Sequence, residues 1–555
     1  MSGQKKPSLT SSISISTQIT ENDGNTLLKN YRWWSLLGIA FSLTNSWLGV
    51  SSSLVVGLYS GGPVLIVYGL IIAVFFTLMC GYTLSEFASA LPNSSGSSFW
   101  VLKLLERNET ADDTTTVKQT GDASDKEEEQ KIITSQQDSL ERPIPISHIR
   151  VSLTVGLINY FGAIFTTSSI CSSLGYSILG CYSLFHPNYE SKRWHVFIIY
   201  ECLNVIIGSL NCWAEILPIL SQAGLFSSLI TYCLTFIVSL ACRSFRKEPW
   251  PSTAYIFKDF KSTSGWSSSG MSFIVGLVNP LWAFAGIDSA THMVDEVGHV
   301  AAVTLVPKAI MGTIIIGFIT SFTYAIGMFY CITDSDSVIS AILPIIEIYY
   351  QATGNKGLAV FLQSCCIITG LFCGIASGTW QSRIIWSIGK DYNTIIGSSF
   401  GDKKGRTIQR LFGRLALIHP FLRVPHWSVF ISHLFVAIIG CVLVGSTTAF
   451  NAIITACICL LLISYAIPTV ILLCKGKRKF YERIALEVPL SCTKKIHCGI
   501  LSCIPNVLTV CWCIFCLIFL SFPYELPVSS TNMNYVSAAY GGVGCVVAII
   551  VLYIF

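Results

Sequence analysis

Long apolar stretches recur along the whole chain, and they constrain its fold more than any other feature. Twelve stretches are long enough to cross a bilayer, which takes about 20 apolar residues per helix. A backbone in lipid must satisfy its own hydrogen bonds, so such stretches form helices. The sequence therefore predicts an all-α integral membrane protein with twelve transmembrane helices. The expected spans are residues 34–59, 62–91, 150–183, 194–212, 219–242, 271–297, 305–332, 357–388, 427–448, 450–474, 500–522 and 535–555.

Composition supports a membrane protein and argues against other classes. Hydrophobic residues make up 52% of the chain and charged residues 12%, whereas soluble proteins carry about 25% charged residues. The net charge of +5 comes from basic residues spread over the loops, a pattern that sets membrane topology, so no nucleic-acid partner is expected. Most of the 22 cysteines lie in apolar spans and are expected to pack between helices.

The distribution of Lys and Arg predicts the orientation in the membrane. With the N-terminus in the cytosol, most of the 35 basic residues fall on the cytosolic side, which places both termini there. The loop before the sixth span, residues 243–261, is the exception because five basic residues fall on the outer side. Residues 1–32 are predicted to be a disordered cytosolic tail, followed by a transporter domain over residues 33–555. Within that domain, the charge-mixed residues 106–140 are predicted to be a disordered cytosolic insertion.

The first and sixth spans are interrupted at corresponding positions. The first contains "NSWLGVSSS" at residues 45–53, where the interruption is predicted at Gly49 and the hydroxyl residues around it. The sixth contains "WAFAGIDSA" at residues 282–290, with Gly286 and Asp288. These spans begin two sets of five helices. Matched interruptions are typical of transporters, so the sequence predicts a 5+5 inverted repeat with broken helices 1 and 6.

Unwound backbone at membrane depth is tolerated where it lines a cavity or is buried in protein. Free N–H groups of such a break favour a carboxylate, and freed carbonyls accept hydrogen bonds from an ammonium group. The paired breaks therefore predict a site for a small zwitterionic or cationic amine. Close helix packing or a simple kink is the alternative for either break taken alone.

Charged residues inside spans are costly and often functional. Asp288 follows the second break and is a candidate for contacting the substrate or carrying a proton, with capping of the second half-helix as the alternative. Glu86 is a candidate gating or packing acid. Asp295 and Glu296 end the sixth span and Arg383 ends the eighth, so they are expected to close an inner gate unless they form a solvated pair.

Other function classes find less support in the sequence. The nine histidines are scattered, and His292 has no second histidine three or four residues away, so no metal site is expected. No phosphate-binding loop or convergent catalytic group is visible, which argues against an enzyme, an ATP-driven pump or a bound cofactor. A nutrient sensor with a permease fold and a passive channel remain as alternatives.

Six motifs identify a family resemblance. They are "YSGGPVLIVYGLI", "SEFASALPNSSGSSFWVLK", "WAFAGIDSATHMVDEV", "GTWQSRIIWSIGKD", "GSTTAFNAIITACICLLLISYAIP" and "SFPYELPVSSTNMNYVS". The chain resembles the fungal amino acid and choline permeases of the amino acid, polyamine and organocation superfamily. The resemblance covers nearly all of residues 33–555 and implies a twelve-helix inverted-repeat fold. It also implies secondary active uptake across the plasma membrane, with a proton as the expected coupling ion.

Within the family, the chain is most similar to members that carry the biotin precursor 7-keto-8-aminopelargonate. The resemblance implies import of that compound, with choline, 4-aminobutyrate or a polyamine as the alternatives. Many relatives have Gly-x-Gly in the first break where this chain has Trp-Leu-Gly, so its site is expected to suit a different or longer substrate. The fifth span lacks a lysine that some proton-coupled relatives carry, so the coupling ion stays open. The motifs place the substrate carboxylate beside Trp47, Leu48 and Gly49, and the amine beside Phe284, Ala285 and Gly286.

Overall fold

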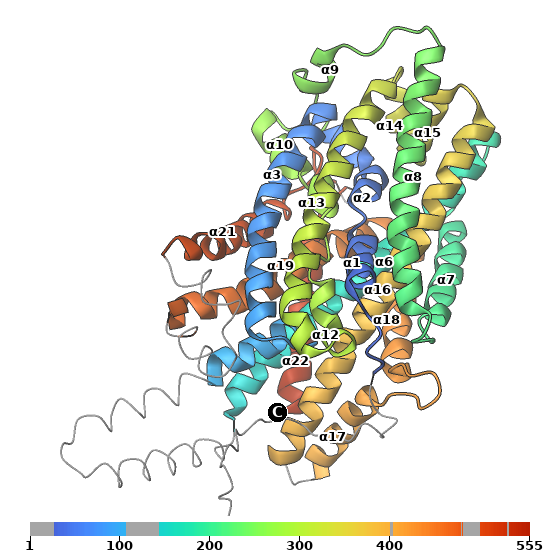
Figure 1. Ribbon diagram of the computed structural model, residues 1–555. Coiled ribbons are helices and arrows are strands. Elements are labelled where there is room, and N and C mark those ends of the chain that lie inside the picture. Colours follow the sequence, from blue (N-terminus) through green and yellow to red (C-terminus); the bar gives the residue numbers. More distant parts are fainter. Residues whose placement is uncertain (1–26, 107–143, 400–402, 479, 481–499, 530–531) are drawn as a thin grey trace, which may run out of the picture.

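The computed structural model describes residues 27–106, 144–399, 403–478, 480, 500–529 and 532–555 (Figure 1). The predicted cytosolic tail lies outside the described residues except for positions 27–32, and the predicted insertion lies outside them except for position 106. At the start of the described chain, Leu27 is buried beside Trp386 and Ile418.

The described part of the chain is a helical bundle with eight helices that are long and apolar enough to cross a membrane. The protein is therefore an all-helical, multi-pass membrane protein. These helices lie roughly side by side in the bundle, with the short helices α9 and α17 at opposite ends (Figure 1). The eight helices are α3 (Leu54–Ala90), α6 (Ile146–Phe185), α8 (Leu217–Phe245), α13 (His299–Cys331), α16 (Lys356–Ser399), α18 (His426–Gly445), α19 (Thr447–Lys475) and α22 (Val536–Ile554).

Four of the twelve expected spans do not form one long apolar helix. The first and sixth are broken into short pieces, α7 carries polar residues such as Glu201, and α21 has 16 residues. A count of long apolar helices in the described chain therefore gives eight where the sequence predicts twelve spans. The pieces are α1 (Trp33–Thr44), α2 (Ser46–Ser52), α7 (Arg193–Leu210), α10 (Ser269–Gly276), α11 (Val278–Trp282) and α21 (Ile504–Phe519).

Shorter helices connect the spans or extend the broken ones. After the second break the chain continues through the 3₁₀ helix η1 (Ser289–Met293) and α12 (Val294–Val297). A proline inside α3, Pro63, follows Gly62, whose left-handed φ of 70° splits that helix at a kink. The remaining short helices are α9 (Thr253–Phe257), α14 (Ser335–Ser340), α15 (Pro344–Thr353), α17 (Lys403–Ala416) and η2 (Ile500–Cys503).

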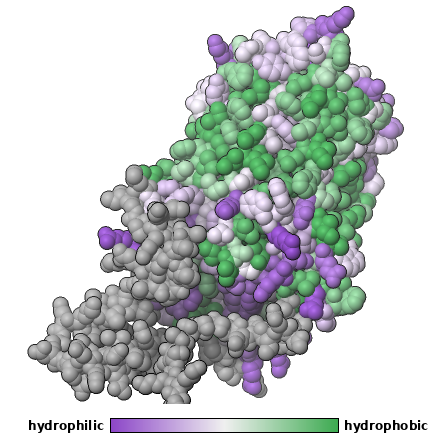
Figure 2. Space-filling view, viewed as in Figure 1, coloured by the Kyte–Doolittle hydropathy of each residue, from purple (hydrophilic) through white to green (hydrophobic). Residues whose placement is uncertain are grey.

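The surface and the interior both suit a bilayer. Figure 2 shows a broad hydrophobic band around the side of the bundle, and many large apolar residues there are exposed. Inside, α1 is buried from Ser35 to Thr44 and packs against α8, α13 and α16. The approach of α1 to α8 requires a glycine, because a Cβ on Gly38 would lie 2.4 Å from the backbone oxygen of Ser221. The first broken helix therefore runs through the centre of the protein.

The structure locates both interruptions. The sequence predicts the first within residues 45–53, and the helix breaks at the two ends of that stretch, Asn45 and Ser53, while Gly49 itself stays helical within α2. Asn45 has φ 35° and ψ 55°, the left-handed conformation that asparagine tolerates better than most residues. The second interruption falls in the predicted stretch, because α11 ends at Trp282 and a turn with Gly286 at φ 78° separates it from η1.

Candidate substrate-binding site

A cavity lies between the two breaks. The predicted site residues Leu48 and Gly49 line it from α2, and Ala285 lines it from the second break. Hydroxyl and amide side chains alternate with apolar ones around it, and none of its described lining residues carries a charge. The other lining residues are Leu43, Thr44, Asn45, Ser52, Thr166, Ile170, Ser173, Leu174, Ser177, Trp282, Gln363, Cys366, Gly370 and Cys373.

Trp47 lies behind this cavity rather than on its wall. Its side chain is fully buried and its ring packs against Tyr324 at 5.0 Å between centroids. The indole Nε1 donates a hydrogen bond to Ser228 Oγ at 2.9 Å, and Ser228 donates to Asn45 Oδ1 at 2.8 Å. Ser228 thus accepts from the indole N–H and gives its own proton to the Asn45 amide oxygen. Trp47 and Ser228 therefore fix the orientation of the Asn45 amide.

This orientation leaves the amide nitrogen of Asn45 as a buried donor. Asn45 Nδ2 has no hydrogen-bond partner among the described residues, and neither has Gln363 Oε1 on the α16 side of the same cavity. An unpaired buried polar group costs about 1–3 kcal/mol, a cost that a bound polar ligand removes. The cavity thus offers one free donor and one free acceptor.

The turn of the second break separates this cavity from another one. The second cavity is lined by the predicted residues Phe284, Ala285 and Gly286, together with Tyr465 and other residues of α3, α19 and α21. Ala285 lines both cavities. A side chain at Gly286 would be strained at φ 78°, and its Cβ would lie 2.9 Å from Leu43 Cδ2, so the Leu43 side chain would have to shift. The turn is therefore a thin wall between two cavities.

Asp288 lines neither cavity but lies buried beyond the turn. Its carboxylate accepts hydrogen bonds from Tyr465 Oη at 2.7 Å and Asn159 Nδ2 at 2.9 Å, and His292 Nε2 lies 3.4 Å away. The side chain makes no cap hydrogen bond to η1, so the alternative capping role finds no support. Asp288 instead joins the broken segment to α6 and α19.

Glu296 and Arg383 form a buried ion pair between α12 and α16. Arg383 Nε donates to Glu296 Oε1 at 2.5 Å, and the two side chains are 1% and 5% exposed. The alternative prediction, a pair of side chains exposed to solvent, is therefore wrong for Glu296 and Arg383. A second pair joins the same segments at the surface, where Lys390 Nζ lies 3.0 Å from Asp295 Oδ1. Two salt bridges of different burial thus tie the end of the sixth span to α16.

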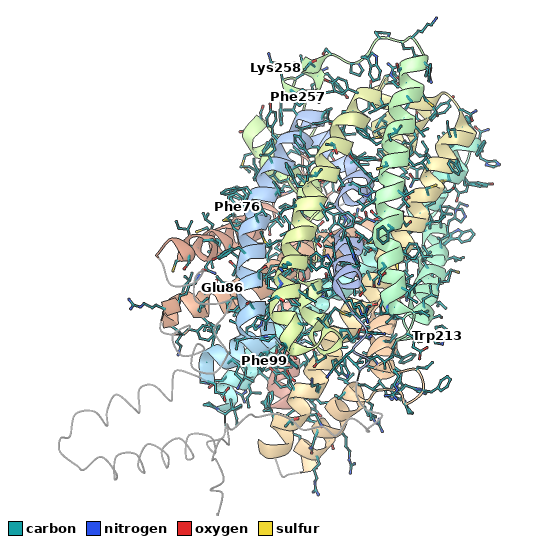
Figure 3. All side chains as sticks on the ribbon, in the orientation of Figure 1. Phe76, Glu86, Phe99, Trp213, Phe257 and Lys258 are labelled. Atoms are coloured by element: carbon teal, nitrogen blue, oxygen red, sulfur yellow. The ribbon has the colours of Figure 1, made fainter. Side chains whose placement is uncertain are left out.

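Glu86 belongs to a separate ion pair. Figure 3 labels it on α3, and its carboxylate lies 2.6 Å from Lys477 Nζ, which follows α19. Asn506 of α21 donates to Glu86 Oε2 at 3.1 Å and accepts from Lys477 at 2.8 Å. The predicted gating set therefore divides into two buried pairs on different elements.

A sequence comparison identifies the family of the chain. The sequence model of the amino acid permease family matches residues 146–545, more than half of the chain. The chain belongs to the amino acid permease family. The family predicted from the six motifs is confirmed, and the permease is a transporter rather than a membrane-embedded enzyme. In the described part of the permease, no group of three or more His, Cys, Asp or Glu side chains is arranged to hold a metal.

Curated relatives match the permease over most of its length. It is 51% identical over 526 residues to the 7-keto 8-aminopelargonic acid transporter of Saccharomyces cerevisiae, covering 94% of the permease and 92% of that protein. It is 35% identical over 519 residues to the choline transporter of the same yeast, covering 93% and 80%. A solved manganese transporter from Eremococcus coleocola matches at 12% identity and a TM-score of 0.49, covering 95% and 96%.

Several residues of the site were not predicted from the sequence. Asn45 lies within the predicted break, and an asparagine beside an interrupted helix was the available signal. Ser228, Gln363 and Thr166 gave none, because small polar residues are common throughout these spans. Their importance depends on neighbours more than 100 residues away in the chain.

Proposed function

We propose that the permease is a secondary active importer of 7-keto-8-aminopelargonate at the plasma membrane, working by alternating access and proton symport. Its twelve spans form a 5+5 inverted repeat with helices 1 and 6 broken. The end with α12 and α17 faces the cytosol, as do both termini. The relative at 51% identity is the Saccharomyces cerevisiae transporter of this compound, and this similarity supports the substrate.

The observation that carries this proposal is the uncharged cavity between the two breaks. A zwitterion has no net charge, so polar groups at its two ends can replace a charged partner. The free amide nitrogen of Asn45 suits a carboxylate, and the free carbonyl of Gln363 suits an ammonium group. Leu48, Ile170 and Leu174 provide apolar surface for the methylene chain between them. The lining matches a long zwitterion better than a compact ion.

Choline is the second candidate because a choline transporter is 35% identical to the permease. A quaternary ammonium group binds best within aromatic rings. Trp282 is the one aromatic residue among the described lining of the first cavity, since Trp47 and Phe284 lie outside it. Polyamines carry several positive charges, and no acid lines this cavity in the described chain. The lining of this cavity therefore favours 7-keto-8-aminopelargonate over choline and over polyamines. It does not distinguish 7-keto-8-aminopelargonate from 4-aminobutyrate, a shorter zwitterion, and experiment has to separate these two.

Growth rescue and labelled uptake test this function together. A biotin-requiring yeast that converts 7-keto-8-aminopelargonate to biotin, but lacks its own transporter, should grow on that compound when it expresses the permease. Labelled 7-keto-8-aminopelargonate should accumulate, and excess choline or 4-aminobutyrate should compete poorly. Binding without accumulation would identify a sensor instead. Uptake that persists after an uncoupler collapses the proton gradient, and only equilibrates, would identify a channel. A fluorescent tag distinguishes plasma membrane from vacuole.

A further inference from the structure

A buried carboxylate and a buried imidazole face each other just after the second break. Asp288 and His292 are 1% and 2% exposed, and His292 Nε2 lies 3.4 Å from Asp288 Oδ2. Asp288 directly precedes η1, and His292 lies within it, four residues later. Both therefore belong to the segment that links the cavity wall to Glu296. Neither group contacts water at the surface, so the protonation of the pair is set by its neighbours.

The neighbours of His292 determine which of its nitrogens carries a proton. Nδ1 lies 2.7 Å from the carbonyl oxygen of Ser94, and a carbonyl can only accept, so Nδ1 must be protonated. In a neutral ring, Nε2 would then present a lone pair to the carboxylate of Asp288. Two acceptors facing each other repel. The arrangement is therefore stable only with one more proton between Nε2 and Oδ2.

The neighbours of Asp288 locate that proton. Tyr465 of α19 donates to Oδ1, and Asn159 of α6 donates to Oδ2. A carboxylate that already accepts two hydrogen bonds is stabilised in its ionised form. With the additional proton on His292, the pair is a buried imidazolium and carboxylate with no net charge.

We propose that Asp288 and His292 form the binding site for the coupling proton of this permease. The inference rests on the proposed function, which names the proton as coupling ion, and assigns the residues that bind this proton. In each cycle, Nε2 takes up one proton from one side of the membrane and releases it to the other, and no other bond is made or broken. Proton loss leaves a buried negative charge opposite a lone pair, which is unfavourable at low dielectric.

The position of the pair couples the proton to movement. Loss of the proton pushes His292 away from Asp288, while Tyr465 and Asn159 keep Asp288 attached to α19 and α6. The displaced segment carries Glu296 and hence the ion pair with Arg383. Proton release is therefore expected to favour opening at the end of the bundle that holds α12.

Few other titratable groups face this pair among the described residues. Tyr465 faces it from α19, and the thiols of Cys80 on α3 and Cys513 on α21 lie beyond Tyr465. On the other sides, α6 contributes the neutral amide of Asn159, and the segment after α3 contributes the Ser94 carbonyl. The helix α16 also packs against η1 and carries Arg383, which is paired with Glu296. The pH dependence of transport is therefore expected to reflect the shared proton together with this ion pair.

Proteoliposomes containing the full chain test the assignment. With 7-keto-8-aminopelargonate outside, the wild type should concentrate it and acidify the lumen, as reported by a trapped pH-sensitive dye. His292→Gln should still exchange labelled for unlabelled substrate but should neither concentrate it nor move protons. His433→Gln, which alters another poorly exposed histidine that contacts Asn204 on α7, is the matched control and should remain coupled. Concentrative, acidifying uptake by His292→Gln would overturn the proposal.

A second measurement needs no substrate. Nitrogen-15 NMR of histidine-labelled protein in lipid, compared with His292→Gln, isolates the signals of His292. Both ring nitrogens should be protonated at about pH 6, and Asp288→Asn should remove the proton from Nε2. A neutral His292 from about pH 5 to 8 would refute the proton site. If the imidazolium signal is present but 7-keto-8-aminopelargonate is not carried, the proposed function fails while the proton site stands.

Discussion

Removing Arg383 should disrupt the closed inner end of the permease far more than substrate binding. Arg383 Nε lies 2.5 Å from Glu296 Oε1, and both side chains are almost fully buried. Deleting one partner of such a pair leaves an uncompensated buried charge, at a cost of about 3–5 kcal/mol. With about 1.4 kcal/mol for each factor of ten, Arg383→Ala should shift the closed–open equilibrium roughly 100-fold to several thousand-fold toward opening.

The adjacent surface pair provides a matched control. Lys390 and Asp295 join the same two segments at 3.0 Å, but the Lys390 side chain is 45% exposed. An exposed pair is worth about 1 kcal/mol or less, so Lys390→Ala should change the equilibrium by no more than about fivefold. If burial determines the contribution of each pair, the two alanine variants should differ by more than an order of magnitude.

Binding and transport have to be measured separately for these variants. In proteoliposomes, Arg383→Ala should reduce net uptake by at least about tenfold, while the Kd for 7-keto-8-aminopelargonate changes by less than about threefold. Adding Glu296→Ala to Arg383→Ala removes the stranded charge and should recover part of the uptake. A loss of affinity with an unchanged maximal rate would refute the gate. So would equal defects in Arg383→Ala and Lys390→Ala.

Three further substitutions test other parts of the site. Gly286→Leu should abolish uptake without removing the protein from the membrane, because a side chain at φ 78° is strained and would press on Leu43. Normal uptake of labelled substrate by this variant would show that transport does not depend on the turn. Ser228→Ala releases the Asn45 amide and should raise the KM about tenfold at unchanged maximal rate. Ser227→Ala, on the same helix, should leave the KM unchanged. Equal KM values for the two variants would contradict the role of Ser228 in orienting Asn45. Glu86→Gln leaves the buried Lys477 without its counter-charge, although Asn506 and the Ser502 carbonyl still accept hydrogen bonds from it, so the melting temperature in detergent should fall by a few degrees. An unchanged melting temperature would show that the ion pair contributes little.

The sequence predicted features that depend on local composition. Apolar length identified the membrane helices, and Gly286 with Asp288 identified the second break within a few residues. The first break was predicted within residues 45–53, at Gly49 and the hydroxyl residues around it, but a glycine between helical neighbours stays helical at modest cost. The helix breaks at Asn45 and Ser53, and the Asn45 side chain is held by Ser228 of another helix.

Features that depend on distant partners could not be predicted. Motif comparison placed Trp47 against the substrate, but its indole is buried against α8 and α13, and it acts through Ser228. No partner for Glu86 could be predicted, since Lys477 lies far along the chain. Arg383 and Glu296 were paired correctly because both end predicted spans on the same side of the membrane, which limits the possible partners.

One short segment links the elements on which transport depends. Between positions 282 and 296, Ala285 lines both cavities, Asp288 and His292 form the buried pair, and Glu296 reaches Arg383. The break at Gly286 frees this segment from α11, so it can shift without moving the rest of the sixth span. A substrate that fills the cavity and a proton that binds His292 then both act on this segment. Coupling follows because neither ligand can displace the segment without altering the site of the other.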